Sequence, residues 1–307
     1  MPGAPFPLAG EVAALSSSLL WACAGIVFRR LRGRASPAAI NLAKNTTAAG
    51  CFAIVGLVLW GAPWPVATPL AAQGLMALSG IVGLSVCDTY FLRAIQELGP
   101  RRATLLMLLS PLLVFAGAAL PPSSETAVLA DPARLAAVLV ALTGIALAAS
   151  EAPAGGTDPA ASRRGILDGL LAAVFQAAGV LLARAAFAAG AGPVDGAMVR
   201  LAVGAAVLAL AGAATGRLSG WARELGRPAT LRTLVPTAFF GTFLGIGAYQ
   251  CALAWGRSAG IASTLNSLAP VWLIPLSAVF LGERHGVRAW LSTALALGGV
   301  AWLALAG

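Results

Sequence analysis

Two ionisable residues stand inside apolar stretches of this chain, where ionisable side chains are rare. Lys44 lies seven residues into the stretch 37–60, and Asp88 lies seven residues before the end of the stretch 71–95. At the rise of a helix, both lie roughly 10 Å inside the same membrane face. A charged residue at a helix centre costs roughly 2.5–3.5 kcal/mol on insertion scales, so it usually faces the protein interior and has a partner. We therefore expect Lys44 and Asp88 to form an ion pair between neighbouring helices.

Three interpretations of these two residues are open. Asp88 is a coupling or gating carboxylate if it exchanges a proton as the protein changes conformation and Lys44 moves away. The pair is structural if it only joins two helices. Lys44 could also extend its side chain to the membrane interface and leave Asp88 alone.

A second pattern repeats along the chain. Tyr90 is followed at 21 residues by Pro111, and Tyr249 is followed at the same spacing by Pro270, 159 positions later. Small residues between them recur in phase. A duplicated membrane unit is the plan of many secondary transporters, which bind substrate near the membrane midplane between the two units.

Pro111 and Pro270 are expected to kink their helices, because proline removes one backbone hydrogen bond and frees the carbonyl four residues earlier. A kinked helix that lines a cavity can offer such carbonyls to a substrate. Six side chains are candidates for the cavity lining: Trp21, Tyr90, Gln176, Tyr249, Gln250 and Asn266. Each could equally serve in packing or in hydrogen bonds between helices.

The composition is that of a membrane protein. Of the 307 residues, 59% are hydrophobic and 10% are charged, against roughly 25% charged in soluble domains. A membrane-spanning helix needs roughly 20 mostly apolar residues. Ten stretches fit: 11–28, 37–60, 71–95, 102–120, 133–150, 165–188, 194–214, 234–256, 260–281 and 287–305. The expected fold is an all-α integral membrane protein with ten transmembrane helices.

The longest polar gap, Glu151–Arg164, divides the chain into two repeats, 1–150 and 151–307. Five helices in each repeat is an odd number, so the second repeat enters the membrane from the opposite side. The repeats are therefore expected to be inverted, with a pseudo-two-fold axis in the membrane plane.

Arginine residues are distributed unevenly between the two sides of this topology. Fifteen basic residues fall in gaps on one side and three on the other, while Lys44 and Arg200 lie within helices. The positive-inside rule places the arginine-rich side in the cytoplasm of a bacterial-type inner membrane and both termini outside it. Arg200 stands in the second repeat where Asn41 stands in the first. Its charge within a helix is explained if its side chain snorkels to the interface or pairs with Asp195.

Several functions are disfavoured. Arginines scattered between apolar stretches do not form the clustered patch that nucleic-acid binding requires. Four separated cysteines without a CxxC motif and a single histidine support neither a metal site nor a disulfide framework, and no cofactor is expected. Gly241 and Gly245 have the spacing of close helix packing, not of a phosphate loop. The dispersed acidic residues argue against a membrane enzyme.

The landmarks together resemble the EamA-type branch of the drug/metabolite transporter superfamily over essentially the whole chain. They are Leu20-Trp21, Tyr90-Phe91-Leu92-Arg93-Ala94, Leu98-Gly99-Pro100, Leu109-Ser110-Pro111, Phe280-Leu281-Gly282-Glu283-Arg284 and Gly298-Gly299-Val300. The resemblance implies a ten-helix carrier of two five-helix repeats that moves small organic solutes such as amino acids, metabolites or drugs. Two features depart from it: Pro121-Pro122 replaces the Gly-Glu expected after the fourth helix, and familiar members are drawn with cytoplasmic termini.

We therefore expect a secondary transporter, an exporter or exchanger, that works by alternating access. Its expected partners are a small-molecule substrate, the lipid bilayer and a proton as the candidate coupling ion, and its expected state is a monomer or weak homodimer. The aromatic and amide groups of the expected cavity favour amphipathic or aromatic solutes over multiply charged ones. A lipid flippase or a non-transporting accessory protein is the alternative.

Overall fold

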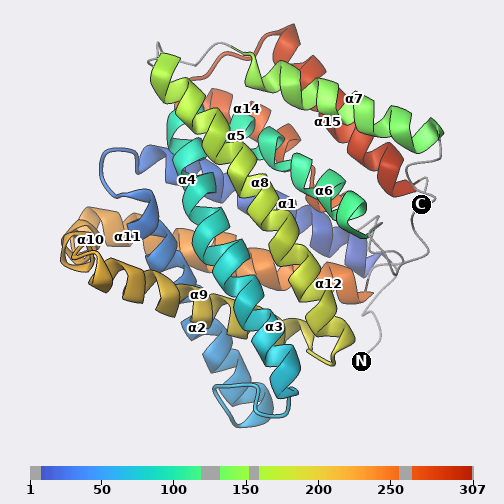
Figure 1. Ribbon diagram of the computed structural model, residues 1–307. Helices are drawn as coiled ribbons and strands as arrows, with labels where there is room; N and C mark the ends of the chain where they lie inside the picture. Colours follow the sequence, from blue (N-terminus) through green and yellow to red (C-terminus); the bar gives the residue numbers. More distant parts are fainter. Residues whose placement is uncertain (1–7, 119–131, 152–158, 256–264, 306–307) are drawn as a thin grey trace.

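The computed structural model describes residues 8–118, 132–151, 159–255 and 265–305, and this part of the chain is helical with short connections (Figure 1). Its elements are α1 (Ala9–Arg30), α2 (Pro37–Trp60), α3 (Leu70–Gly80), η1 (Ile81–Val86), α4 (Cys87–Leu98), α5 (Pro100–Met107), α6 (Leu109–Ala118), α7 (Pro132–Ala149), α8 (Pro159–Ala188), α9 (Pro193–Ala214), α10 (Leu218–Leu225), α11 (Pro228–Thr237), η3 (Ala238–Leu244), α12 (Gly245–Trp255), α14 (Ala269–Leu281) and α15 (Val287–Leu305).

Where the structure describes them, the ten apolar stretches coincide with helix apart from turns at Leu108, Ser150, Ser267 and Leu268. Six helices of the described part are long and apolar enough to cross a membrane: Ala9–Arg30, Pro37–Trp60, Leu70–Leu98, Pro159–Ala188, Pro193–Ala214 and Pro228–Ala252. The sixth and eighth stretches begin about two turns earlier than expected, at Pro159 and Pro228. The chain is thus an all-helical, multi-pass membrane protein.

Proline and glycine set many of the helix ends. Pro37 and Pro193 begin α2 and α9, where the missing amide hydrogen costs nothing because the first helical turn has no internal acceptor for it. Gly61 follows α2 with φ 71°, and Gly282 follows α14 with φ 70°. This left-handed conformation ends a helix and suits glycine, which has no Cβ.

Two long helices each contain a π-helical segment. Leu70–Leu98 consists of α3, η1 and α4, and the later long helix consists of α11, η3 and α12. The segments η1 and η3 both lie directly before the part of the helix that carries the repeated tyrosine, Tyr90 or Tyr249. Such π-helical turns are rare, and those that do occur are frequently found at functional sites.

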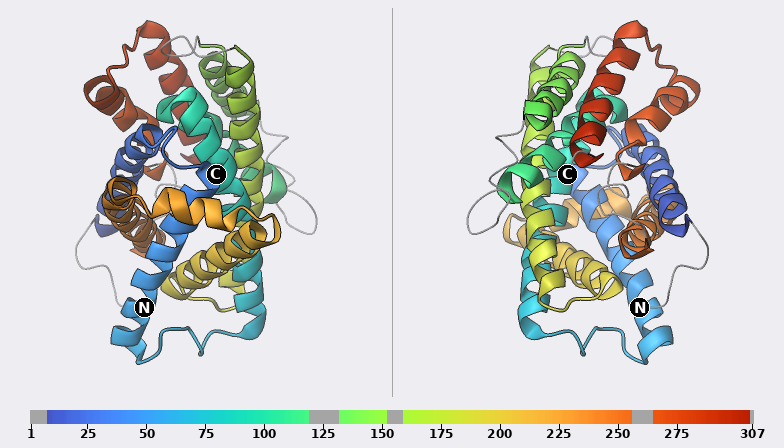
Figure 2. Two further views of the ribbon diagram at one scale, coloured as in Figure 1. Left: turned by 90° about the vertical axis from the view of Figure 1, so that its left-hand side faces the viewer. Right: turned by 90° about the vertical axis from the view of Figure 1, so that its right-hand side faces the viewer.

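The helices pack in pairs that cross between the two halves of the chain. The helix α1 packs on α12 and α14, and α8 packs on α4 and α6 in the corresponding way. Likewise α2 packs on η3 and α9 packs on α3, while α2 and α9 pack on each other. Figures 1 and 2 show α7 and α15 side by side at one edge of the molecule, with the connection from α2 to α3 at the opposite end.

The expectation that Pro111 and Pro270 kink continuous helices is wrong in detail. The helix is interrupted at Leu108, and a new helix begins at Leu109, so Pro111 is only its third residue. A second interruption precedes α14, in which Pro270 is the second residue. A proline in the first helical turn removes no internal hydrogen bond, which explains why a break replaces a kink.

Small residues let the crossing helices approach closely. A Cβ added to Gly241 would lie 2.5 Å from Cβ of Ala24, and one added to Gly245 would lie 2.5 Å from Nε1 of Trp21. This confirms that Gly241 and Gly245 serve close packing, here against α1. In the other half, a Cβ on Gly179 would lie 2.8 Å from Cα of Gly83.

Candidate functional site

The expected ion pair is present. Nζ of Lys44 on α2 lies 2.5 Å from Oδ2 of Asp88 on α4, and the two side chains are 7% and 19% exposed. The ammonium group also donates to Oδ1 of Asn45 at 2.9 Å. Lys44 therefore does not extend to the membrane interface. Since two partners satisfy it in the interior, the ion pair is an enclosed polar site within the helix bundle.

An amide network joins this pair to the π segment η1. Nδ2 of Asn45 donates to Oδ1 of Asn41 at 3.1 Å, and Nδ2 of Asn41 donates to the carbonyls of Leu84 and Ser85 at 2.8 and 3.1 Å. A π turn leaves some carbonyls without a donor from their own helix. Here the amide of Asn41 is the donor. These hydrogen bonds connect α2 to the long helix that carries Asp88.

A second cation, Arg200 on α9, belongs to the same cluster. Asp88, Cys87 and Tyr249 are the ionisable groups near enough to Arg200 to act on its charge. Nε of Arg200 is buried without a hydrogen-bond partner among the residues the structure describes. The expected pairing with Asp195 is not found among the described residues; Asp195 instead accepts a hydrogen bond from Oγ1 of Thr68 at 2.9 Å.

Arg200 and Lys44 occupy corresponding places in the two halves. Arg200 stands seven residues after Pro193, which begins α9, and Lys44 stands seven residues after Pro37, which begins α2. Aligning the helix starts therefore matches Arg200 with Lys44 rather than with Asn41. The positions of Pro37 and Pro193 in the sequence indicate the match between Arg200 and Lys44. The offset between the two tyrosines pairs Arg200 with Asn41 instead.

Gln176 on α8 lies beside this cluster, and its expected place in a cavity lining stays a prediction. Sγ of Cys87 lies 3.6 Å from Oε1 of Gln176. A Cβ added to Gly83 would lie 3.2 Å from Nη2 of Arg200 and 4.0 Å from Oε1 of Gln176. The absence of a side chain at Gly83 is what lets the guanidinium lie against η1.

The two repeated tyrosines each meet an aromatic residue of the opposite half. The ring of Tyr90 stacks on that of Phe175, with centroids 5.8 Å apart, and the ring of Tyr249 lies 5.8 Å from that of Trp21. All four side chains keep part of their surface accessible. Aromatic pairs of this kind can bound a solute passage or simply pack the crossing helices.

The two remaining candidates differ in their environment. Gln250 is 5% exposed and donates from Nε2 to the carbonyl of Pro193 at 2.9 Å. Its amide therefore joins α12 to the start of α9, and its expected place in a cavity lining stays a prediction. Asn266 is 8% exposed, and its Oδ1 has no hydrogen-bond partner within the described ranges. A buried acceptor without a donor is a candidate contact for a solute.

The arginine-rich ends of the helices form a separate polar network. Arg101 at the start of α5 is 3% exposed, pairs with Glu151 and donates to the carbonyl of Ala289 on α15 at 3.2 Å. Arg30 on α1 donates to the carbonyl of Phe280 on α14 at 2.6 Å. These contacts join the first half of the chain to the second at that face.

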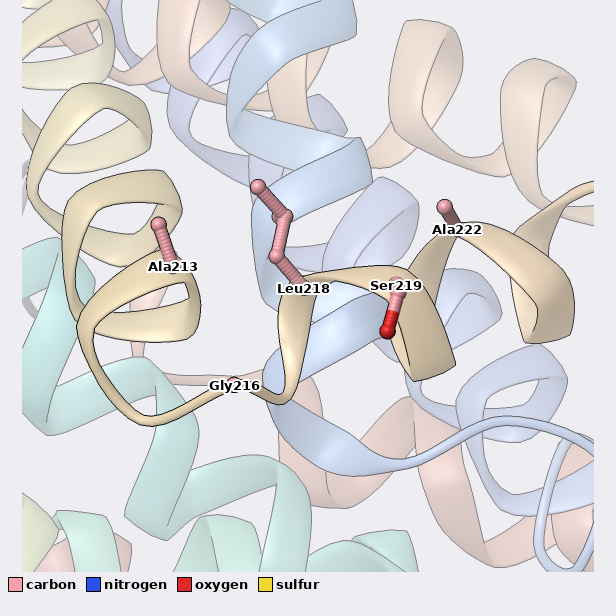
Figure 3. A pocket seen from close by; sticks show the side chains of 5 residues that line it. All are labelled: Ala213, Gly216, Leu218, Ser219 and Ala222. Carbon is pink, nitrogen blue, oxygen red and sulfur yellow. The ribbon is translucent and has the colours of Figure 1, made fainter.

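A shallow apolar hollow lies elsewhere, at the turn between α9 and α10 (Figure 3). Its lining residues are Ala213, Gly216, Leu218, Ser219 and Ala222. One hydroxyl and four small or apolar residues offer no charge and almost no hydrogen bonding to a ligand. The charged groups Lys44, Asp88 and Arg200 lie on other helices than this hollow or, for Arg200, in an earlier part of α9.

Similar proteins agree with a transporter. Over 66 residues the chain is 46% identical to the "Probable terminal-alkyne amino-acid exporter" of Streptantibioticus cattleyicolor, a match that spans 20% of this chain and 22% of that protein. A solved structure titled "Crystal structure of protein" matches with a TM-score of 0.61 and 20% identity, covering 97% of this chain and 96% of that one. That likeness shows the fold.

The model of the EamA-like transporter family matches residues 8–121 and again residues 163–305. The two matched ranges include all the described helices of the charged cluster. They cover most of the chain, so this membrane protein belongs to the EamA-like transporter family.

Proposed function

We propose that the chain is a secondary transporter that exports or exchanges a small organic solute by alternating access between two inverted five-helix repeats. The observation that carries the proposal is the charged cluster, in which Lys44 and Asp88 from the first half meet Arg200 from the second. Charges within a membrane are expensive, and they are retained mainly along transport pathways. The cluster lies where the halves meet, which is where inverted-repeat carriers bind substrate.

The packing of the helices supports the two-repeat arrangement. Exchanging the halves converts the contact of α1 with α12 into that of α8 with α4, and the contact of α2 with η3 into that of α9 with η1. The π segments and the tyrosine–aromatic pairs follow the same exchange. Two such units can rock against each other around a fixed central site.

In the proposed cycle, Asp88 is the coupling carboxylate and Lys44 its conformational partner. While the pair is closed, the ammonium favours the ionised carboxylate. A rearrangement that separates α2 from α4 removes that counter-charge, and Asp88 then accepts a proton. Proton binding is thereby linked to one conformation and solute binding to the other, which is sufficient for coupled exchange.

The asymmetric arginine distribution supports an orientation in a bacterial-type inner membrane with the arginine-rich network in the cytoplasm and the termini outside. In this orientation the contacts of Arg101 and Arg30 join the two halves at the cytoplasmic face. They are suited to act as a gate that must open when the central site faces the cytoplasm.

Amino acids are the first solutes to test, because a relative is named as a probable amino-acid exporter. Purified protein in proteoliposomes should exchange external labelled solute for internal unlabelled solute. A lipid flippase would instead move a fluorescent phospholipid between leaflets without solute exchange. Phospholipid movement without exchange of any amino acid or related metabolite would contradict the proposal and favour the alternative.

A further inference from the structure

We propose that the hollow between α9 and α10 binds an anionic phospholipid, with an acyl chain in the hollow and the phosphate held by Arg217 and Arg223. This inference goes beyond the proposed transport function and does not depend on it. Three observations carry it: the hollow lies at the end of a membrane-spanning helix, its walls are held in place, and unneutralised arginines border it.

The hollow lies at the level of the membrane surface. One wall is Ala213, in the last turn of Pro193–Ala214, a helix long and apolar enough to cross a membrane. The chain then turns at Gly216, and Figure 3 shows Leu218, Ser219 and Ala222 of α10 across this turn from Ala213. Apolar surface at the end of a spanning helix lies at the boundary between lipid headgroups and acyl chains.

Two contacts hold α10, and with it the walls of the hollow. Trp221 is 8% exposed and lies so close to Gly212 on α9 that a Cβ at Gly212 would clash with its ring. Oε2 of Glu224 accepts hydrogen bonds from the amide and the hydroxyl of Ser36, just before α2, at 2.8 and 2.7 Å. Because α10 is fixed to two neighbouring helices, the hollow is a formed part of the structure, with a volume of about 420 Å³.

Two arginines border the hollow. Arg217 stands in the chain between Gly216 and Leu218, which both line it. Nε of Arg223 donates to the carbonyl of Ser219, a third lining residue, at 3.3 Å. Both arginines are exposed, and within the described ranges neither forms an ion pair. Guanidinium groups are therefore present at the rim of an apolar surface.

The segment as a whole has an excess of positive charge. Residues 213–232 contain four arginines and a single acidic residue, Glu224, which already accepts two hydrogen bonds from Ser36. A guanidinium binds a phosphate group through paired, charge-assisted hydrogen bonds. Basic residues next to membrane helices attract anionic lipids in the same way. The charge at the rim thus calls for a phosphate, and the hollow for an acyl chain.

Other occupants match only one half of this site. A zwitterionic phospholipid fills the hollow equally well but brings a positive charge of its own to the arginines. A soluble phosphate ester supplies the anion but leaves the apolar surface uncovered. An anionic phospholipid satisfies both, since its headgroup and its acyl chain are joined at the level where Arg217 and Arg223 border the hollow.

The first test titrates the purified protein with phosphatidylglycerol or phosphatidylcholine of matched acyl chains and measures the bound lipid by native mass spectrometry. Phosphatidylglycerol should bind more tightly. Arg217→Gln combined with Arg223→Gln should weaken its binding roughly 25-fold, about fivefold for each arginine, and leave phosphatidylcholine binding unchanged. The matched control is Arg163→Gln combined with Arg164→Gln, which removes two exposed charges near the start of α8 and should resemble the wild type.

The second test fills the hollow and keeps its charges. Ala213→Leu places a larger side chain in the hollow and should weaken phosphatidylglycerol binding roughly tenfold, because about two acyl methylene groups lose their burial. Ala214→Leu adds the same atoms to the next residue, which is also exposed but does not line the hollow, and should bind as the wild type does. Glycerol 3-phosphate, which has the charge without the acyl chains, should not displace the lipid.

Several results would overturn the lipid site. They are equal affinity for the two lipids in the wild type, a preference for phosphatidylglycerol that survives in the folded Arg217/Arg223 variant, an equal loss in the Arg163/Arg164 control, and displacement by glycerol 3-phosphate. If the Arg217/Arg223 variant does not fold, the alanine variants decide, and equal binding by Ala213→Leu and Ala214→Leu would contradict the site. Solute exchange is measured separately in proteoliposomes, so either proposal can fail without the other.

Discussion

Nζ of Lys44 lies 2.5 Å from Oδ2 of Asp88, whereas in the second half Arg200 stands at the place of Lys44 and Gly247 at the place of Asp88. The π segments and the main helix contacts of the described residues follow a similar pattern in both halves, but the charges do not. A symmetric scaffold allows a carrier to adopt two related conformations. In the proposed cycle, the asymmetric charges let proton binding and solute binding favour different conformations.

The orientation can be tested with fusions to the C-terminus. A fused alkaline phosphatase should be active, because that enzyme folds outside the cytoplasm, and a fused green fluorescent protein should be dark. A fusion in the connection between α1 and α2, which is rich in arginine, should behave in the opposite way. Fluorescence at the C-terminus together with an inactive phosphatase would reverse the orientation and leave the transporter assignment intact.

The arginine-rich network should depend on its buried member. Glu151→Gln leaves Arg101, 3% exposed, without its counter-charge and should cost roughly 3–5 kcal/mol of unfolding free energy. Glu97→Gln removes the partner of Arg32 from a pair whose side chains are 31% and 42% exposed, and it should cost at most about 1 kcal/mol. Unfolding in detergent measures both. Equal losses would show that burial does not determine the strength of this network.

His285, between α14 and α15, should make stability fall in mild acid. Burial lowers its pKa from the ordinary value of 6.5, and Arg101 lowers it further, against the opposing effects of Glu283 and Glu151. The unfolded chain therefore binds the proton more readily. Stability is full above pH 6.5 and decreases as the pH falls below this value toward the folded pKa.

The measurement for His285 is the unfolding temperature between pH 7.5 and 5, roughly the range in which histidine titrates. His285→Gln should flatten the acid side of this profile, because it removes the titrating group and keeps a side chain that can bond Oγ of Ser277, now 2.6 Å from Nε2. A variant with the same acid-side slope as the wild type would refute the assignment.

Two neighbouring glycines on α12 should respond oppositely to alanine. Gly245→Ala brings a methyl group to 2.5 Å from Nε1 of Trp21 and should cost about 1–3 kcal/mol of stability, because α1 or the indole must move. Gly247→Ala meets nothing closer than 4.0 Å and should be neutral or stabilising by up to about 1 kcal/mol. Thermal unfolding of both variants provides the comparison, and a loss in Gly247→Ala would mean that the space beside it is filled.

The helices could be predicted from sequence because long apolar stretches have few alternatives in a membrane. The ion pair of Lys44 and Asp88 could be predicted because the two residues lie at equal depth below the same membrane face. The π segments could not be predicted, since they arise from packing and from donors such as Asn41. The helices break before Pro111 and Pro270, whereas the sequence analysis expects kinks there. The spacing of prolines does not show whether a proline lies in the first turn or in the middle of a helix.

The environment of each polar side chain also could not be predicted from the sequence. Gln250 belongs to a contact between helices, whereas Arg200, expected to snorkel, has a buried Nε beside the charged cluster. Snorkelling and burial differ only in the direction in which a side chain extends. That direction is set by neighbouring helices, and here by the small size of Gly83.

The coupling role of Asp88 is the central claim, and transport in proteoliposomes with and without a pH gradient tests it most directly. Asp88→Asn should fold, keep solute exchange and lose gradient-driven transport, because the amide cannot carry a proton. A purely structural pair predicts instead that Asp88→Asn loses folding and that Lys44→Gln restores it. Unchanged gradient-driven transport by a well-folded Asp88→Asn protein would contradict the account.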